Sequence, residues 1–563
     1  MLKKKITKKS IISIVFSVTL IGGMLLFAGC GSNDDEAEAP TVTASTGTYI
    51  GQENDGVAEF KGIRYGEYEP FLPATDVTTT EDDEIVVTDW GASCIQPYDE
   101  VEVASQGECS QDCLYLNVFT KDVTSSDKPV IVWIHGGSYI WGGTNDPCYD
   151  PQYFVRNLPD GEDCVFVTIN YRLNFMGGCD LSSLEGYTDE YASAINISKL
   201  DQTQALKWVS ENIEAWGGDA DNVTVMGHSS GGAAVQMLMA DPDSNQYFNR
   251  VIENSGVQSQ VAISKETVAE DSKKTFEILG VESIDELTAL TDEEINEKIE
   301  EITNETDLGN RCADGDIISE TWWDDLKNGS AADIDLLIGS VNGEEDWDAI
   351  DWDNSISEPV SDASVIYDMI AEKEETKADV YGRYYVLGDN DELYNKFLSL
   401  SDDDVKSTMD LWNEIAAPYP SLITAEEQSE NNVNVYLYYW EYAPDKDEVL
   451  EYSGDSAEVS PWGRAMHTMD VCFEFGTKEG YTELAGDPDK MSDNMIENMQ
   501  TAIYNFAKTG DPNGDGVAEW TPYNSDTKCT MVMKSDESWV CESNYRSEVY
   551  DLLRTIRPYG ESD

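Results

Sequence analysis

Residues 222–240 limit the possible folds of this 563-residue chain more than any other segment. They read NVTVMGHSSGGAAVQMLMA: a β-rich run, a glycine-rich turn and an apolar helical run, in that order. A G-x-S-x-G pattern between a strand and a helix is typical of a nucleophile elbow, in which a sharp turn lifts the central serine clear of a sheet. We therefore predict that Ser229 is a nucleophile at the end of a buried strand.

Strand-like and helix-like runs alternate along much of the remaining chain. Residues 129–137 and 164–172 are β-rich runs that end at turns, as buried parallel strands do. Residues 200–218 carry apolar residues at helical spacing, and two further strand-like runs occupy residues 335–343 and 433–442. This alternation predicts an α/β fold with a mostly parallel central sheet flanked by helices.

The composition changes between about residues 264 and 304, where the chain becomes acidic and amphipathic. We predict that this segment forms surface helices inserted over the core. The sequence contains no internal repeat, and we assign residues 48–558 to one α/β domain that includes the helical insertion.

The first residues predict export from the cytoplasm. A head with five lysines precedes an apolar run over residues 11–28, and small residues follow around Cys30. This order is typical of a signal peptide over residues 1–29, and LFAGC resembles a bacterial lipobox, whose cysteine carries lipid. We expect Cys30 to be lipidated, residues 30–47 to be a flexible acidic tether, and the protein to be anchored to a membrane of the bacterial cell envelope. The alternative is an uncleaved anchor, because the apolar run is long enough to span a bilayer.

Charge and cysteine usage narrow the possible partners. The formal net charge is −76, which opposes binding to nucleic acid, so we expect no nucleic-acid partner. Of the eleven cysteines, ten remain for pairing in an oxidising compartment once Cys30 carries lipid. The sequence has no C-x-x-C pair and only three histidines, so no zinc site stands out. We expect neither a metal nor an organic cofactor.

A serine nucleophile needs a base, and three histidines are available. His228 adjoins Ser229, but neighbouring side chains at a sharp turn point apart. His135 stands at a strand end that runs into glycines, a type of loop that presents backbone N–H groups to an oxyanion. His467 lies late in the chain, where the order serine, acid, histidine places the base. We predict that His467 is the base and that His135 orders its loop.

The acid of such a triad must lie between Ser229 and His467, directly after a strand. The strand-like run over residues 335–343 is followed closely by three acidic residues, Glu344, Glu345 and Asp346. An acid at this place fixes the tautomer of the histidine and stabilises its imidazolium. The sequence pattern alone leaves all three residues open for this role.

Several ordered motifs together resemble the type-B carboxylesterase/lipase family, which includes cholinesterases and bacterial carboxylesterases. The motifs are FKGIRYG, QDCLYLNVF, PVIVWIHGGSY, NYRLNFMGG, VIENSG and FAKTGDPN, and the resemblance runs from about Tyr49 to Tyr523. It implies an α/β-hydrolase fold and a serine carboxylesterase that hydrolyses small carboxylic esters through an acyl-enzyme.

The resemblance also implies roles for individual residues. The family's triad acid stands five places after the first glycine of G-x-x-x-D-E-G, and Glu344 stands in that place after Gly339. The stretch around His467 and Asp470 resembles the family's glycine–histidine–acid motif. The implied oxyanion donors are the backbone N–H groups of Gly137, Ser138 and Ser230. The implied disulfide joins Cys94 to Cys113, with Cys109 as a rival.

Two departures from the family bear on the substrate. His228 replaces the glutamate that helps to hold a cation in cholinesterases, and the segment between Cys94 and Cys113 has no tryptophan to stack on choline. A choline ester is therefore disfavoured. A lipase acting on longer acyl chains and a catalytically silent binding or adhesion module remain as alternatives. The acyl group, the alcohol group and the oligomeric state stay open.

Overall fold

The computed structural model describes residues 39–97, 108–256, 262–306, 308–309, 311–346, 413–414, 416–431, 433–453, 459–460, 463–478 and 482–556. The predicted signal peptide and the predicted lipidated Cys30 lie outside these ranges. Within them, none of the helices has the length and apolar character needed to cross a membrane.

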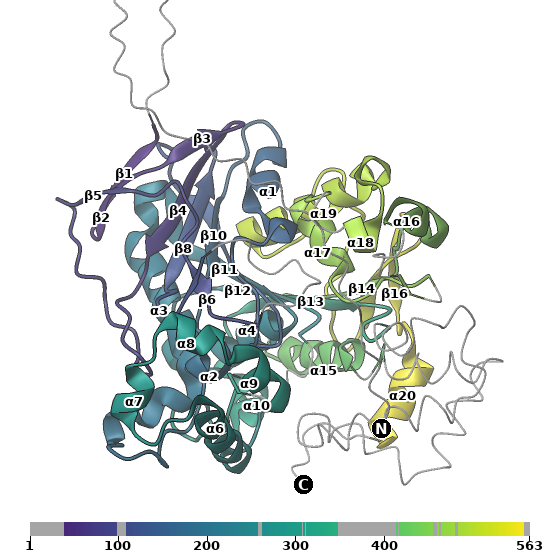
Figure 1. Ribbon diagram of the computed structural model, residues 1–563. Helices are drawn as coiled ribbons and strands as arrows, with labels where there is room; N and C mark the ends of the chain where they lie inside the picture. The colour runs from purple at the N-terminus through teal and green to yellow at the C-terminus, as the bar shows by residue number, and fades with distance from the viewer. Residues whose placement is uncertain are drawn as a thin grey trace, which may run out of the picture. The chain divides into compact units, whose positions relative to one another are not determined.

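Eleven strands form one large sheet (Figure 1). In sheet order they are β16 (Trp539–Ser543), β15 (Cys529–Met533), β14 (Val435–Trp440), β13 (Asp335–Val341), β12 (Arg250–Asn254), β11 (Gly218–His228), β9 (Lys128–Ile134), β10 (Val165–Ile169), β8 (Tyr115–Thr120), β4 (Val57–Arg64) and β3 (Gln52–Asn54). The strands from β15 to β10 run parallel to one another. The remaining strands pair antiparallel at the two edges. The predicted mostly parallel sheet is confirmed.

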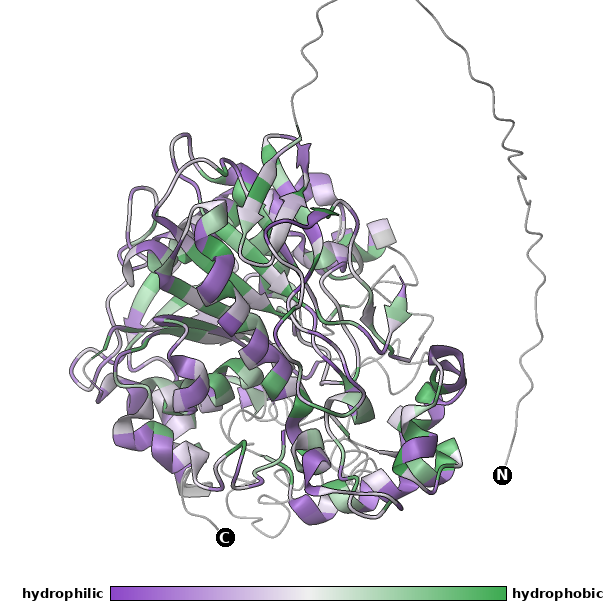
Figure 2. Ribbon diagram, turned by 90° about the vertical axis from the view of Figure 1, so that its left-hand side faces the viewer, coloured by the Kyte–Doolittle hydropathy of each residue, from purple (hydrophilic) through white to green (hydrophobic). Residues whose placement is uncertain are grey.

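Helices cover both faces of this sheet, which explains the uninterrupted apolar strands. Along β9, Val130 and Val132 belong to one hydrophobic core, whereas Ile131 and Trp133 belong to the other. The first core includes residues of α3 (Ile197–Asn212), α4 (Ser230–Ala240) and α15 (Pro418–Ser429). The second includes residues of α1 (Pro151–Asn157), α17 (Met469–Phe475) and α19 (Asp493–Thr509). In Figure 2 the apolar residues gather in the strands between these helices.

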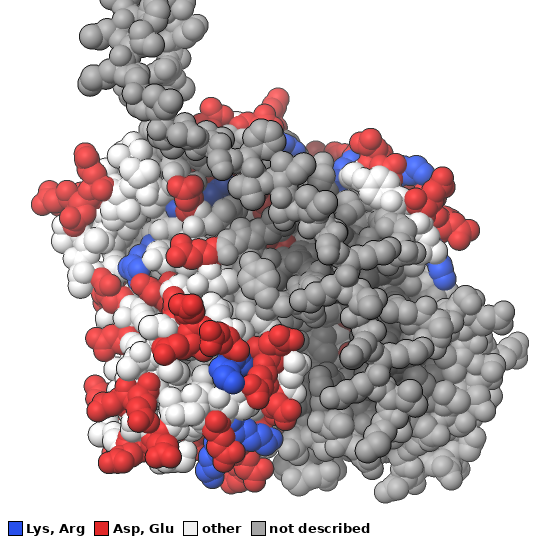
Figure 3. All heavy atoms as spheres, viewed as in Figure 1, with Lys and Arg blue, Asp and Glu red and all other residues white. Residues whose placement is uncertain are grey.

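The predicted insertion is helical, as expected. It consists of α6 (Lys265–Leu279), α7 (Ile284–Thr288), α8 (Asp292–Asn296) and α9 (Ile299–Glu305). Ser264, Ser283 and Thr291 begin the first three helices by accepting a hydrogen bond from a backbone N–H of the first turn. Apolar side chains such as Phe276 and Ile302 join the core, while acidic side chains crowd the outer surface (Figure 3).

Shorter elements complete the described chain. The remaining helices are α2 (Asn174–Gly177), α5 (Pro242–Asn245), α10 (Trp322–Asp325), α16 (Lys446–Ser453), α18 (Thr482–Ala485) and α20 (Ser547–Ile556), with 3-10 turns such as η3 (Ile213–Trp216). The small strands are β1 (Thr41–Ala44), β2 (Gly47–Ile50), β5 (Glu84–Val86), β6 (Ser93–Cys94) and β7 (Cys109–Ser110).

The predicted tether over residues 30–47 is wrong for its last part. Strand β1 pairs antiparallel with β2, which in turn pairs with β5. Val42 and Ala44 are buried in the core, while Thr41 and Thr43 between them are exposed. The alternating sequence T-V-T-A therefore buries one side of a strand, and its lack of charge separates it from the acidic residues before it.

The predicted disulfide between Cys94 and Cys113 is not formed in the structure. Cys94 and Cys113 are both free and both buried in this structure. Cys94 accepts a hydrogen bond from the N–H of Leu173 at 3.2 Å. A disulfide joins Cys529 to Cys541 across the antiparallel strands β15 and β16, with a Cα–Cα distance of 5.8 Å. Sequence reasoning left that pairing open because spacing does not determine connectivity.

Candidate active site

The predicted nucleophile elbow lies between β11 and α4. Ser229 has φ 57° and ψ −125°, a strained backbone conformation for a residue with a side chain. A Cβ atom on Gly227 would lie 2.4 Å from the carbonyl oxygen of Gly231, and one on Gly231 would lie 2.2 Å from that of Ile134. Both glycines of the G-x-S-x-G pattern are therefore required for the turn to close.

His467 and Glu344 meet beside this elbow. His467 Nδ1 donates to Glu344 Oε2 at 2.5 Å. The other carboxylate oxygen of Glu344 accepts from Ser255 Oγ at 2.6 Å and from the N–H of Val341 at 2.9 Å. Glu344 is buried, and these bonds fix its carboxylate with one oxygen facing the imidazole. The geometry thus selects Glu344 from the three acids that the sequence pattern left open.

The electrostatic environment suits His467 as a base that becomes an imidazolium. Burial lowers the pKa of His467, but the charge of Glu344 and its hydrogen bond, with smaller contributions from Glu345 and Asp470, outweigh burial and raise that pKa above its ordinary value. Asp470 is itself buried, and burial together with the charge of Glu344 raises the pKa of Asp470 to about 6. The hydroxyl of Tyr438 donates to Asp470 at 2.8 Å.

The other two histidines lie close to the elbow but have different surroundings. The rings of His228 and His467 pack with centroids 4.6 Å apart and planes 38° from parallel. Burial, and then the charge of His467, lower the pKa of His228 well below its ordinary value. Burial lowers the pKa of His135 to about 4, and its Nδ1 lies 2.8 Å from the carbonyl oxygen of Gly136. His135 also stacks on Tyr171 at 4.5 Å, so it orders the glycine loop.

The predicted oxyanion loop lies against the elbow. Gly137 and Ser138 both have positive φ, at 105° and 56°. The N–H of Tyr139 donates to Ser230 Oγ at 3.3 Å, which ties the loop to the first turn of α4. A Cβ atom on Gly136 would lie 2.9 Å from the Cβ of Ser229. The loop therefore has no room for a side chain where it passes the serine.

The N–H groups predicted to receive the oxyanion are available at this loop. Among the described residues, the N–H groups of Gly137, Ser138 and Ser230 donate to no backbone or side-chain acceptor. For Ser230 this follows from its place in the first turn of a helix, where backbone N–H groups have no partner within the helix. The positive end of the α4 dipole adds to the attraction for a negative oxygen.

Two residues of the site were not recognised in the sequence. The carbonyl of Asn254 accepts from the N–H of Ser229 at 2.9 Å, and Ser255 binds Glu344 as described above. Asn254 ends β12, the strand next to the elbow strand, and Ser255 follows it with a positive φ of 46°. The motif VIENSG contained them, but only the pairing of β11, β12 and β13 shows that they connect the nucleophile to the acid.

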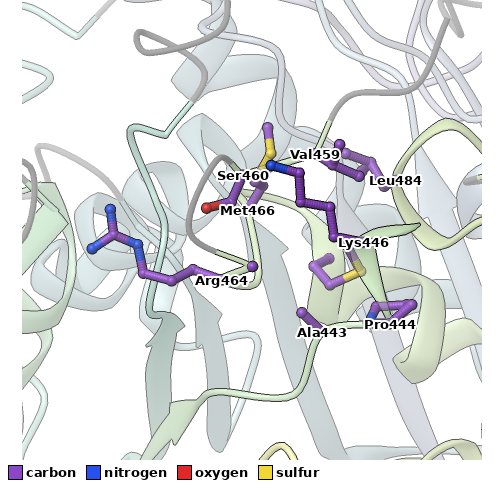
Figure 4. A pocket seen from close by; sticks show the side chains of 10 residues that line it. Ala443, Pro444, Lys446, Val459, Ser460, Arg464, Met466 and Leu484 are labelled. Carbon is purple, nitrogen blue, oxygen red and sulfur yellow. The ribbon is translucent and has the colours of Figure 1, made fainter. Parts of the chain in front are cut away.

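A shallow pocket is lined in part by Gly463, Arg464 and Met466, which precede His467 in the chain (Figure 4). It is open to solvent and is lined by Ala443, Pro444, Lys446, Val459, Ser460, Gly463, Arg464, Met466, Met469 and Leu484. None of the predicted triad or oxyanion residues lines it. The hollow is therefore distinct from the site at Ser229.

A mostly parallel sheet, a strained serine at a strand–helix turn and a histidine bonded to an acid that follows a neighbouring strand define a serine hydrolase of the α/β-hydrolase fold. The sequence profile of the carboxylesterase family matches residues 38–553. The chain belongs to the carboxylesterase family, and it is a carboxylic ester hydrolase.

Individual relatives agree with this assignment. The chain is 30% identical to para-nitrobenzyl esterase from Bacillus subtilis (strain 168) over 515 residues, which covers 88% of this chain and 95% of the relative. It is 27% identical to liver carboxylesterase from Sus scrofa over 450 residues, covering 74% and 73% of the two chains. A solved structure of a PNB esterase matches with a TM-score of 0.73 and 27% identity, covering 91% of this chain and 99% of the other.

Proposed function

We propose that Ser229, His467 and Glu344 form the catalytic triad of this carboxylesterase. Ser229 attacks the ester carbonyl while His467 takes the proton from its hydroxyl and later gives that proton to the leaving alcohol. Glu344 holds the imidazole in the required tautomer and stabilises the imidazolium. The observation that carries this proposal is the 2.5 Å contact of His467 with Glu344 beside a serine held in a strained elbow.

The N–H groups of Gly137, Ser138 and Ser230 stabilise the oxyanion in this proposal. Their loop is fixed by the Tyr139–Ser230 bond and by its close approach to Ser229, so little reorganisation is needed as negative charge develops. Water then attacks the acyl-enzyme with His467 as base, and the carboxylic acid leaves. In the described residues no group of three or more His, Cys, Asp or Glu side chains is placed to hold a metal ion, and no step here needs one.

The triad is tested with para-nitrophenyl and para-nitrobenzyl esters of short acids, the second chosen because of the relative's name. We expect turnover by the wild-type chain and a loss of roughly 10⁴-fold or more in Ser229→Ala. Ser183→Ala, at an exposed serine, is the matched control and should behave as wild type. An organophosphonate probe should label Ser229 alone. A wild-type chain with neither activity nor labelling would favour the silent binding module.

A simple esterase and a lipase differ in their response to an interface. The acidic surface of the helical insertion lacks the apolar lid that an interface-activated lipase would use, so we propose an esterase for soluble substrates. Activity should therefore follow the dissolved concentration of a triglyceride. A sharp rise in activity above its solubility limit would favour the lipase.

We also propose that the protein is a lipid-anchored enzyme of the bacterial cell envelope, with a signal peptide ending before Cys30. The support is the order of basic head, apolar run and LFAGC in the sequence. Cys30→Ala should release the protein from membranes, and wild-type protein should carry a lipid mass on the peptide beginning at Cys30. Membrane-bound Cys30→Ala with an intact apolar run would indicate an uncleaved anchor.

A further inference from the structure

The acid and the base of the proposed triad come from two loops that are far apart in the sequence. The loop after β13 carries Glu344, and the loop before α17 carries His467. Backbone contacts join the two loops near the triad: Gly343 forms a parallel bridge with Met466, and the N–H of Ala465 donates to Asn342 Oδ1 at 2.8 Å. These contacts align the two loops next to Glu344 and His467.

A buried ion pair between Arg464 and Asp346 also joins these two loops. Arg464 Nε donates to Asp346 Oδ2 at 2.9 Å, and Arg464 Nη2 donates to Oδ1 at 2.6 Å. The side chain of Asp346 is fully buried and that of Arg464 is 9% exposed. Ser460 Oγ and Asn413 Nδ2 also donate to the Asp346 carboxylate. Two parallel bonds between planar groups determine orientation as well as distance.

Both members of this ion pair lie close in sequence to members of the proposed triad. Asp346 lies two residues after Glu344, and Arg464 lies three residues before His467. In Figure 4 the guanidinium of Arg464 extends away from Lys446 and the other side chains of the pocket. Arg464 thus lines the hollow with its stem, while its charged group serves the contact between the loops.

We propose that Arg464 and Asp346 are positioning residues that hold the Glu344 loop against the His467 loop and so maintain the contact of Glu344 with His467. The proposal rests on the proposed function of the triad. A buried ion pair gives little net stability, because desolvation offsets most of the attraction, so its role here is to fix one geometry. Misplacement of a catalytic group by about 1 Å can cost roughly 10²-fold in rate.

The charges that face His467 define a readout beyond rate. Glu344, Glu345 and Asp470 supply negative charge to the imidazole, and the neutral ring of His228 packs on it. When Glu344 moves away, the pKa of His467 should fall, because burial then lowers it with less opposition. Since the base must be neutral, the acidic limb of kcat/KM should move to lower pH.

The test uses Asp346→Asn, Arg464→Gln, Arg464→Lys and the double variant Asp346→Asn with Arg464→Gln. The active-site concentration of each is titrated with the organophosphonate, and circular dichroism reports its folding. We expect kcat per active site to fall about 10- to 100-fold in Asp346→Asn and Arg464→Gln, with KM changed less than about threefold. The acidic limb should shift to lower pH, and Arg464→Lys should recover part of both effects. The double variant should lose less than the product of the two single losses, because both substitutions break the same Asp346–Arg464 pair.

Arg156→Gln is the matched control, because Arg156 forms an exposed pair with Asp55 at 3.0 Å. It should keep the wild-type kcat and pH profile.

The proposal is overturned if the folded Asp346 and Arg464 variants keep both the kcat and the acidic limb of wild type, even when their melting temperature falls. If the single variants do not fold, Ser460→Ala removes one donor to Asp346 and should give a smaller shift in the same direction; an unchanged profile there also overturns it. Absence of Ser229-dependent turnover in the wild-type chain would instead contradict the proposed function.

Discussion

The two halves of the proposed active site differ in how the chain builds them. The nucleophile half is local: β11, Ser229 and α4 are contiguous, and adjacent glycines provide the turn. The acid–base half joins two loops separated by 123 residues, and it depends on strand pairing and on side-chain contacts between the loops. A local motif resists rearrangement through backbone sterics, whereas a long-range site needs several independent contacts to hold the same precision. The two halves should therefore respond differently to substitution.

The largest effect should follow from removing the base. His467→Gln leaves Ser229 in its elbow without a proton acceptor, so we expect kcat/KM to fall by roughly 10⁴-fold or more. Thermal unfolding should change little, because the elbow does not depend on this side chain. Steady-state kinetics on a para-nitrophenyl ester and a melting curve measure both outcomes. Full activity in His467→Gln would show that Ser229 reacts without His467, and it would contradict the assignment of His467 as the base.

Loss of the acid should come next. Glu344→Gln keeps the shape of the side chain but removes the charge that faces His467 and disturbs its tautomer, so we expect a loss of about 10⁴-fold in kcat. The pKa of His467, raised mainly by Glu344 against burial, should fall, and the acidic limb of any residual activity should move to lower pH. Glu345→Gln is the matched control at the neighbouring acid. A larger loss in that control would reassign the triad acid.

The local half of the site could be predicted from the sequence, whereas the acid–base half could be predicted only in part. The central strands and the elbow were predicted because their apolar runs and glycines encode local geometry. His467 was predicted because few histidines exist, but Glu344 was selected only through the family resemblance and is now distinguished by its bond to the imidazole. The roles of Ser255 and of the Asp346–Arg464 pair were not predicted, because they depend on which strands and loops are neighbours.

The cysteines and the first strand show the same limit. Nothing in the spacing of Cys529 and Cys541 distinguishes them from other pairs, and the register of β15 against β16 brings them together. Strand β1 was assigned to a tether because its four residues are too few to give a clear alternation, although two of them are buried. Long-range pairing determines both outcomes, as it does for the acid–base half.

The local half should be sensitive to backbone packing. In Gly231→Ala the new Cβ atom would lie 2.2 Å from the carbonyl oxygen of Ile134, and in Gly232→Ala it would lie 2.9 Å from the Cα of Gly256. Both glycines occupy the first turns of α4, so helix propensity affects them alike. We expect Gly231→Ala to destabilise the fold by about 1–3 kcal/mol, more than Gly232→Ala, and to lower kcat as the elbow shifts. Denaturant titration and kinetics test the order; equal effects would mean that the elbow relaxes more readily than its contacts indicate.

The smallest effect should come from His228, where the two halves touch. Its ring packs on His467, and burial lowers the pKa of His228 well below its ordinary value, so the protonated ring is too unfavourable for His228 to take the proton of Ser229. His228→Gln should therefore keep kcat within about tenfold of wild type, while His467→Gln abolishes turnover.

Loss of the ring contact exposes His467, and because burial lowers the pKa of His467, that pKa should rise and the acidic limb should move to higher pH. In Glu344→Gln and in the Asp346 and Arg464 variants, the acidic limb should instead move to lower pH. The pH profiles of these variants therefore distinguish a change in the burial of His467 from a loss of the charge that faces it. Abolished turnover in His228→Gln together with activity in His467→Gln would exchange the roles of the two histidines.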